Sequence, residues 1–266
     1  MGPIKLYWCR GSGRKDPNRQ NFGDYLSADI VEFVSGKKVE HAPVKSAELI
    51  AIGSVLGREK KAKIWGFPRK LHIWGAGTAD SQDLFSSRHY YHAVRGKKCA
   101  SRIQGSDRQP VLGDPGLLSS SLVNRPLQKN ARIGIIPHIN HRASPTIKAL
   151  LQRLPGSKVI DVYSPVKQVL SEIAACEFVL STSLHGLIVA DSYGVPNQWM
   201  VMERNANWEF KFQDYYSAFG IHDPAPVTAD QILQNPTWSV EACIGDYLRP
   251  GLGDIQENLI KAFPAL

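Results

Sequence analysis

Hydrophobic runs and segments with helical periodicity alternate along the second half of the chain. Apolar runs of three to six residues are typical of buried strands, and apolar residues spaced three and four apart indicate helices. The predicted strands cover 132–137, 159–163, 178–180 and 198–202, and the predicted helices cover 146–154, 166–175 and the segment that begins near Leu184. Strands and helices in this alternation, joined by short loops, predict a parallel sheet covered on both faces.

The first half repeats this alternation less regularly. A predicted strand at 4–8 is followed by a basic, glycine-rich loop and then by a helix from Asn21 to Gly36. The apolar stripe of that helix consists of Leu26, Ile30, Phe33 and Val34, and further strands are predicted at 48–54, 71–74, 90–94 and 111–115.

Between residues 118 and 129 the composition shifts to Ser, Asn, Arg, Pro and Gln, which is typical of a linker. We therefore predict an α/β protein of two Rossmann-like, doubly wound domains facing a cleft, residues 1–125 and residues 126–266. The tail from 240 to 263 is expected to be mostly helical and to pack across the domain boundary.

Composition narrows the class of protein. A hydrophobic content of 43% and a charged content of 21% are those of an ordinary folded protein. No apolar run approaches the length of a membrane span, and the start of the chain does not resemble a secretory signal, so we expect a cytoplasmic protein. The four cysteines are scattered, without the spacing of metal or redox motifs, and we expect no metal and no cofactor.

The positive charge is concentrated in the first half. Up to residue 127 there are 21 Lys and Arg against 11 Asp and Glu, a net charge of +10, whereas the remainder carries −2. Such an excess suits nucleic acid, an anionic membrane surface or phosphorylated ligands. Because no nucleic-acid recognition motif is present, we expect no nucleic-acid partner. The most basic segments contain Arg10, Arg14, Lys15 and Arg19, and Arg58, Lys60, Lys61 and Lys63.

The candidate chemistry centres on His185. It lies at the start of a predicted helix that follows the predicted strand 178–180. Free amide groups and the helix dipole favour the binding of anions at that point. A helix cap or a core position is the alternative for a single histidine. From the same stretch we expect Ser183, Leu184 and Gly186 to contact the substrate.

Other polar residues follow predicted strands and could share one cleft with His185. Fixed cations beside backbone amides suit a small ligand with phosphate and carboxylate groups. Surface charge, for the cations, and helix capping, for Asn21 and Asp24, are the alternatives. These candidates are Asn21, Asp24, Gly75, Gly77, Arg95, His138 and Lys211.

Several motifs together resemble the polysaccharide pyruvyl transferase family. The most specific are the stretch from Ser183 to Pro196 and the run from Lys211 to Tyr216. IPH at 136–138 also matches the family. Weaker N-terminal pieces in the family's order are NFGD at 21–24, GAGT at 75–78, VRG at 94–96 and GDP at 113–115.

This resemblance implies a glycosyltransferase-B-like fold and a reaction. Members transfer enolpyruvate from phosphoenolpyruvate to two hydroxyls of one sugar, which makes a pyruvate ketal and releases phosphate. Arg95, His185 and Lys211 match the family's donor-site residues, but Ser183 stands where many members have arginine. His185 is the first choice as acid and base, and His138 and Asp24 are candidates for deprotonating the acceptor.

The expected acceptor is a lipid-linked oligosaccharide or another glycan precursor, with the basic first half making peripheral contact with an anionic membrane. Two alternatives stay open. One is a nucleotide-sugar glycosyltransferase on the same scaffold, although no acidic ribose-binding residue stands out at the strand ends of the second domain. The other is a non-catalytic protein that binds anions or nucleic acid through the basic first half.

Overall fold

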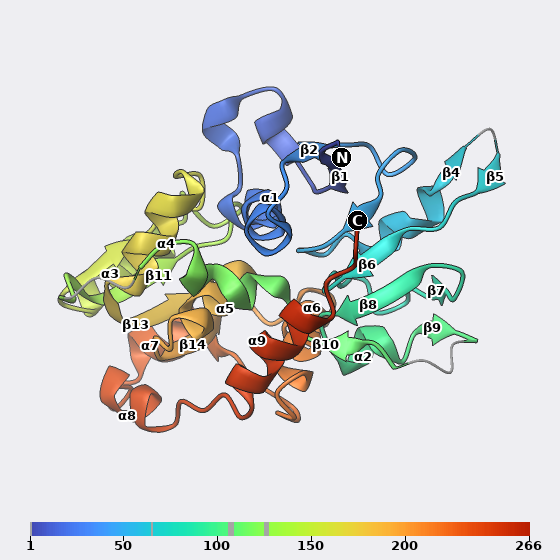
Figure 1. Cartoon of the computed structure of the whole chain (residues 1–266). Coiled ribbons are helices and arrows are strands. Elements are labelled where there is room, and N and C mark those ends of the chain that lie inside the picture. The colour runs from blue at the N-terminus through green and yellow to red at the C-terminus, as the bar shows by residue number, and fades with distance from the viewer. Residues whose placement is uncertain (1, 65, 106–108, 125–127) are drawn as a thin grey trace.

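The strand pattern of the first half forms one parallel sheet (Figure 1). The computed structural model describes residues 2–64, 66–105, 109–124 and 128–266. Within these residues the first sheet has six strands, all neighbours parallel, in the order β10-β8-β6-β3-β1-β2. Their bounds are β1 (Ile4–Tyr7), β2 (Val39–His41), β3 (Leu49–Ile50), β6 (His72–Trp74), β8 (Tyr90–Val94) and β10 (Val111–Leu112).

The second half forms its own parallel sheet, as the alternation predicts. In the described part of the chain it has five strands in the order β12-β11-β13-β14-β15. The prediction of a strand at 159–163 is wrong in position, because the strand ends at Val159 and an Asp161-centred turn follows. The strands are β11 (Ala131–Ile136), β12 (Ser157–Val159), β13 (Cys176–Ser181), β14 (Asn197–Val201) and β15 (Val227–Thr228).

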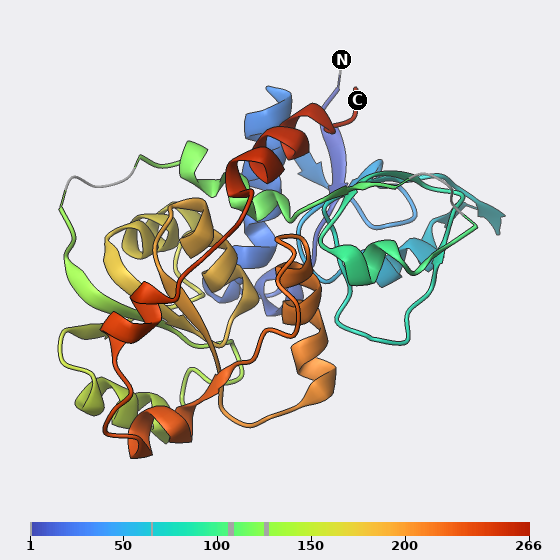
Figure 2. The same cartoon turned by 90° about the horizontal axis from the view of Figure 1, so that it is seen from below.

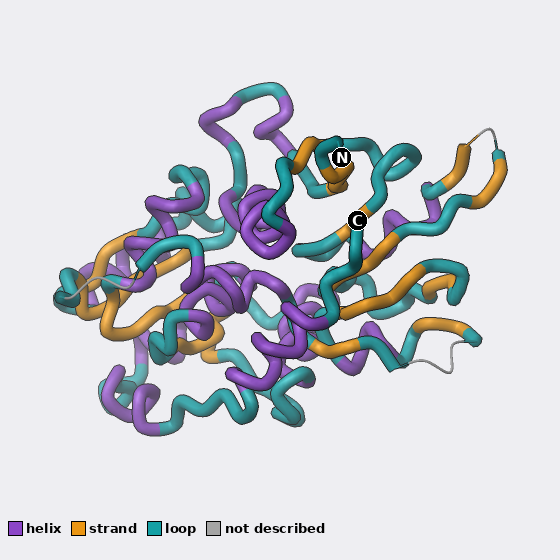
Figure 3. Tube along the Cα trace, viewed as in Figure 1, coloured by secondary structure: helices purple, strands orange, loops and turns teal. Residues whose placement is uncertain are grey.

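Helices pack around and between these sheets (Figures 1 and 3). The helix predicted from Asn21 to Gly36 is present as α1, and Gly36 ends it in the left-handed conformation at φ 65°. Phe33 does not belong to its buried stripe, since 49% of it is exposed. The helices are α1 (Phe22–Ser35), α2 (Lys97–Ala100), α3 (Pro145–Arg153), α4 (Val166–Ala174), α5 (Leu184–Ser192), α6 (Ala206–Ser217), α7 (Ala229–Gln234), α8 (Val240–Gly245) and α9 (Leu252–Lys261).

Two small strand pairs project from the first half. They are the antiparallel pair β4 (Lys63–Ile64) and β5 (Phe67–Pro68), and the parallel pair β7 (Phe85–Ser86) and β9 (Ile103–Gln104). Figure 1 shows both pairs at the edge farthest from the second sheet.

One hydrophobic core runs through both halves. It joins Leu26 of α1 and Trp74 of β6 to residues of α4, α5 and β13. The predicted linker begins too early, because Leu117, Leu118 and Ser119 are buried in a 3₁₀ helix, Pro115–Ser121, that packs against α1 and α5. Residues 125–127, where the predicted domain boundary falls, lie outside the described residues. The two sheets therefore divide near this point, whereas this core cluster spans both halves. Two further clusters of buried, described residues are each confined to one half.

The end of the chain returns to the first half. Trp74 Nε1 donates to the Leu259 carbonyl of α9 at 2.9 Å, and the rings of Trp74 and Phe263 meet edge to face at 4.8 Å. Figure 2 shows α9 crossing toward the N-terminal strand, with the two termini close together. The predicted helical tail across the boundary is thus present. Among the described residues, no helix has the length and apolar character to cross a membrane.

Candidate active site

The first turn of α1 is built around His185. Asn21 caps the helix by accepting a hydrogen bond from the Gly23 amide at 3.1 Å, and the Phe22 amide donates to the Val162 carbonyl at 2.9 Å. A Cβ on Gly23 would lie 2.1 Å from His185 Nδ1, so only glycine fits there. The NFGD sequence therefore anchors the first half on the second and seats the imidazole against α1.

Helix α5 presents His185 from the second half. Every residue of α5 except His185 is buried, the polar Asp191 and Ser192 included, so the helix runs through the core. His185 Nε2 is buried and has no hydrogen-bond partner among the described residues. An unpaired buried nitrogen is costly, which favours a position where a ligand completes the hydrogen bond.

Asp24 and His185 share the space in front of Gly53. A Cβ on Gly53 would lie 3.7 Å from Asp24 Oδ1 and 4.0 Å from His185 Cε1. Burial raises the pKa of Asp24 to about 7, although the charge of Lys211 lowers it. Burial, and then the charge of Lys211, lower the pKa of His185 to about 3. Near neutral pH the carboxyl group is therefore partly protonated while the imidazole is neutral.

Lys211 and His138 line a cleft of about 610 Å³ between the two halves. Burial and the charge of Arg95 lower the pKa of Lys211 to about 8, and burial and the charge of Lys211 lower that of His138 to about 3. Lys211 forms no ion pair with a described carboxylate, and its Nζ lies 4.8 Å from the ring centroid of Trp208. The cleft thus holds a cation that an anionic ligand can pair with. Its wall consists of Ser54, Ala79, Asp80, Ser81, Gln82, His138, Asn207, Trp208 and Lys211.

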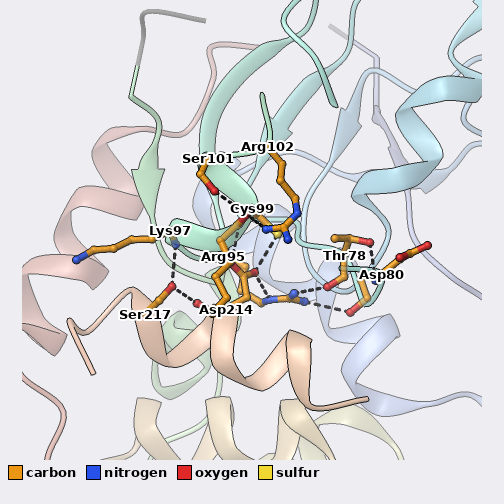
Figure 4. A network of polar contacts seen from close by, with 11 residues as sticks. Thr78, Asp80, Arg95, Lys97, Cys99, Ser101, Arg102, Asp214 and Ser217 are labelled. Carbon is orange, nitrogen blue, oxygen red and sulfur yellow. Dashed lines mark hydrogen bonds and ion pairs between the residues drawn. The ribbon is translucent and has the colours of Figure 1, made fainter. Parts of the chain in front are cut away.

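Arg95 does not line this cleft and is bonded within the protein (Figure 4). Its side chain is 0% exposed, and Nε donates to Asp214 of α6 at 2.9 Å. The other guanidinium nitrogens donate to Ser54 Oγ at 3.0 Å and to the Thr78 carbonyl at 2.5 Å. Arg95 therefore ties β8 to α6, and its expected contact with the donor stays a prediction.

Two glycines of the GAGT sequence have structural explanations. A Cβ on Gly75 would lie 2.0 Å from Pro115 Cδ, and one on Gly77 would lie 2.3 Å from Arg95 Cζ. Their amides donate to the Ala93 and Gly53 carbonyls at 2.7 and 3.0 Å. These N–H groups are therefore not available to hold substrate oxygens, contrary to what the strand-end pattern suggests.

The residues around His185 are packed closely. A Cβ on Gly186 would lie 2.5 Å from Ser181 Oγ, and the Ser183 amide donates to the same oxygen at 2.9 Å. Leu184 is 5% exposed and belongs to the core. Substrate contact by Ser183, Leu184 and Gly186 stays a prediction. The same holds for Asn21, whose side-chain oxygen caps α1.

Sequence reasoning missed three residues. Asp214 holds Arg95 and also accepts from the Cys99 amide at 2.8 Å, and its position three residues after Lys211 in the same motif was the available signal. Trp208 is 45% exposed at the mouth of the cleft. Ser54 ends a predicted strand, which is the usual place for ligand contacts in α/β folds.

The geometry supports proton transfer beside a bound anion. The ammonium group of Lys211 is close enough to lower the pKa values of both the Asp24 carboxyl and the His185 imidazole, and the different protonation states of the three groups suit acid and base roles. Within the described residues no group of three or more His, Cys, Asp or Glu side chains is arranged to hold a metal ion.

The chain matches the model of a known protein family. The family model for polysaccharide pyruvyl transferase matches residues 11–199, well over half of the chain. The chain belongs to this family. The resemblance inferred from the motifs is thereby confirmed, and the match includes Asp24, Arg95, His138 and His185 but ends before Lys211.

Two curated relatives are similar over parts of the chain. Succinoglycan biosynthesis protein ExoV of Rhizobium meliloti (strain 1021) is 26% identical over 204 residues, which cover 76% of this chain and 62% of that protein. Uncharacterized protein L143 of Acanthamoeba polyphaga mimivirus is 34% identical over 145 residues, 49% of this chain and 48% of that protein. The matched region thus spans about half to three fifths of each relative. No solved structure matches the chain significantly.

Proposed function

We propose that the protein transfers the enolpyruvyl group of phosphoenolpyruvate to two hydroxyls of one sugar in a polysaccharide precursor. The products are a pyruvate ketal and phosphate. Family membership supports pyruvyl transfer to a polysaccharide. The observation that carries the proposal further is the meeting of Asp24, His185 and Lys211 from both halves beside one cleft. We also propose a glycosyltransferase-B-like arrangement, which the two parallel sheets and the returning α9 support.

The donor is an anion of high charge. Phosphoenolpyruvate carries about −2.5 to −3 at neutral pH, from its phosphate and carboxylate. Lys211 supplies a positive charge that no described carboxylate pairs with. The first turn of α5 has no side-chain cap, so its amides are available for anionic oxygens. Many members of the family have arginine at the position of Ser183. In this protein the α5 amides are proposed to make the anion contact that this arginine makes in those members.

The pKa values favour Asp24 as the acid, which reverses the role that the sequence suggests for it, while His185 remains both base and acid. Protonated Asp24 donates its proton to the methylene carbon of phosphoenolpyruvate, and neutral His185 accepts the proton of the first sugar hydroxyl as it attacks C2. The imidazolium then protonates the departing phosphate. When the second hydroxyl attacks C2, its proton returns to the Asp24 carboxylate, so both groups end as they began. Such proton transfers each contribute a factor of about 10² to 10⁴.

A nucleotide-sugar glycosyltransferase is the second candidate, and one observation favours it. A pocket of about 530 Å³ lies at the carboxyl ends of β11, β13 and β14. Sequence reasoning found no acidic residue there, but Glu203, Glu209 and Asp230 line this pocket. Glu209 is paired with Arg204, whereas Glu203 is exposed and could bind a ribose.

Ligand binding separates the two candidates. Thermal-shift and calorimetric titrations should give a response to phosphoenolpyruvate and none to UDP-glucose. The reaction itself is tested by phosphate release from phosphoenolpyruvate with a panel of lipid-linked oligosaccharides, followed by mass spectrometry of the ketal. His185→Ala and Asp24→Asn should each lower kcat by at least about 10²-fold. A response to UDP-glucose alone would favour the glycosyltransferase instead.

A further inference from the structure

A third hollow lies at the carboxyl end of β1, and it shares no lining residue with the cleft that holds Lys211. Its volume is about 750 Å³, within the usual range for small-ligand sites. The loop after β1, blue at the top of Figure 1, forms one side of it, and the 3₁₀ helix Leu56–Lys61 forms another. We call this hollow the basic pocket, and its lining residues are Tyr7, Trp8, Cys9, Arg10, Gly11, Arg14, His41, Pro43, Val44, Lys45, Arg58 and Lys61.

The lining of the basic pocket has five cationic side chains and no carboxylate. Within the described part of the chain, none of the five forms an ion pair. Like charges this close repel one another, and a concave wall focuses their field. An anionic ligand removes that repulsion. The five residues are Arg10, Arg14, Lys45, Arg58 and Lys61.

Only some of the basic residues of the first half line the basic pocket. The two basic segments of the sequence meet in it, but only some of their cations line it. Lys60 instead pairs with Asp83 at 2.9 Å, and the Arg19 guanidinium lies 5.9 Å from the ring of Tyr163 in the second half. Lys63 lines a different hollow. The fold thus gathers part of the positive charge around one concavity instead of spreading all of it over a flat face.

Two further atoms point to a ligand. Arg10 Nε and Trp8 Nε1 are buried and have no hydrogen-bond partner among the described residues. Trp8 is 8% exposed and meets the His41 ring edge to face at 4.7 Å, which gives the basic pocket an aromatic wall. Arginine donors suit phosphate oxygens, and an aromatic wall suits the apolar face of a sugar.

The basic pocket is linked electrostatically to one of the reacting groups. Burial and then the charge of Asp24 raise the pKa of Cys9, which lines the basic pocket. Asp24 in turn shares the space in front of Gly53 with His185.

We propose that the basic pocket binds the diphosphate of a glycan acceptor that is joined to its carrier through a diphosphate. This assignment rests on the proposed function, because it gives the acceptor its place opposite the donor cleft. A diphosphate offers several oxygens to several cations, and the volume leaves room for the adjoining sugar. A membrane surface fits less well, since these five cations line a hollow and are not spread over an open face.

The first test needs no catalysis. Isothermal titration calorimetry with inorganic pyrophosphate, in the absence of phosphoenolpyruvate, should show binding to the wild type. Arg10→Ala and Arg58→Ala together should weaken it by at least about tenfold, since charge-assisted hydrogen bonds to phosphate are lost. Lys38→Ala is the control, because Lys38 is exposed just before β2, at the amino ends of β1 and β2, whereas the basic pocket lies at the carboxyl end of β1. Circular dichroism checks that all variants are folded.

The second test is kinetic. With phosphoenolpyruvate as donor, Arg10→Ala/Arg58→Ala should raise KM for a glycan diphosphate at least about tenfold. It should leave KM for phosphoenolpyruvate and kcat unchanged. The same glycan without diphosphate should have equal KM values with wild type and variant. The proposal would be overturned if the double substitution left pyrophosphate binding intact, or if it raised KM equally for both acceptors. It would also be overturned if the protein bound phosphatidylserine vesicles in a sedimentation assay but did not bind pyrophosphate. Absence of phosphate release with any acceptor would refute the proposed function, and calorimetry would still decide the basic pocket.

Discussion

Replacing Gly23 with alanine should disable the site through a single methyl group. That methyl would lie 2.1 Å from His185 Nδ1 and 2.6 Å from His185 Cβ. Non-bonded heavy atoms settle at about 3.5 Å, so the imidazole or the first turn of α1 must move by roughly 1 Å. A displacement of about 1 Å at a catalytic group costs about 10²-fold in rate. Overpacking costs a further 1–3 kcal/mol, approximately, in the free energy of unfolding.

Two measurements test this expectation, kcat for phosphate release from phosphoenolpyruvate and urea-induced unfolding. Gly253→Ala is the control, because Gly253 also lies in the first turn of a helix, α9, and its Cβ would meet nothing within 4 Å. Helix propensity predicts that this control is as stable as the wild type, or more stable by up to about 1 kcal/mol. If Gly23→Ala kept more than about a third of the wild-type kcat and unfolded at the same urea concentration, the close seating of His185 on α1 would be refuted.

Three further predictions follow from the buried charges. Asp214→Asn, which leaves Arg95 as a buried cation, should lower the free energy of unfolding by about 3–5 kcal/mol, whereas Glu241→Gln at an exposed ion pair should have no measurable effect in the same urea titration. Lys211→Met should raise the pKa of Asp24 above about 7 in a carbon-13 NMR titration, because the charge of Lys211 lowers it, and an unchanged pKa would rule out that coupling. The folded state holds the Asp24 proton more tightly than the unfolded state, so Asp24 lowers the free energy of unfolding as pH rises from about 4 to about 7. The free energy of unfolding of Asp24→Asn should therefore exceed that of the wild type by an amount that grows across this interval. A difference between the two proteins that stays constant with pH would contradict the raised pKa.

Local patterns were sufficient for much of the fold and part of the site. The apolar run 178–180 and the helix after it located His185 correctly at a strand-to-helix junction. Capping residues and the terminal glycine located α1, and hence Asp24, because these signals act within one helical turn. The parallel sheets followed from alternation alone.

Interactions between distant residues could not be predicted in this way. Arg95 pairs with Asp214, 119 residues away, and neither residue carries a local sign that it is buried. The basic residues near Arg10 and Arg58 were treated as two patches because no periodicity relates one loop to another. Which of them share a hollow depends on how β1 and β3 pair in the sheet, a tertiary property.

The return of α9 to the first sheet ties the two ends of the gene together. Consider a hybrid of two relatives made by one crossover near residue 125. Its Trp74 would come from one parent, whereas Leu259 and Phe263, which contact Trp74 from about 185 positions later in the chain, would come from the other. Exchange of acceptor-side or donor-side halves therefore requires a second crossover before Leu252, so that α9 travels with the first half. A shuffled library that includes this second junction should yield more folded hybrids than one that does not.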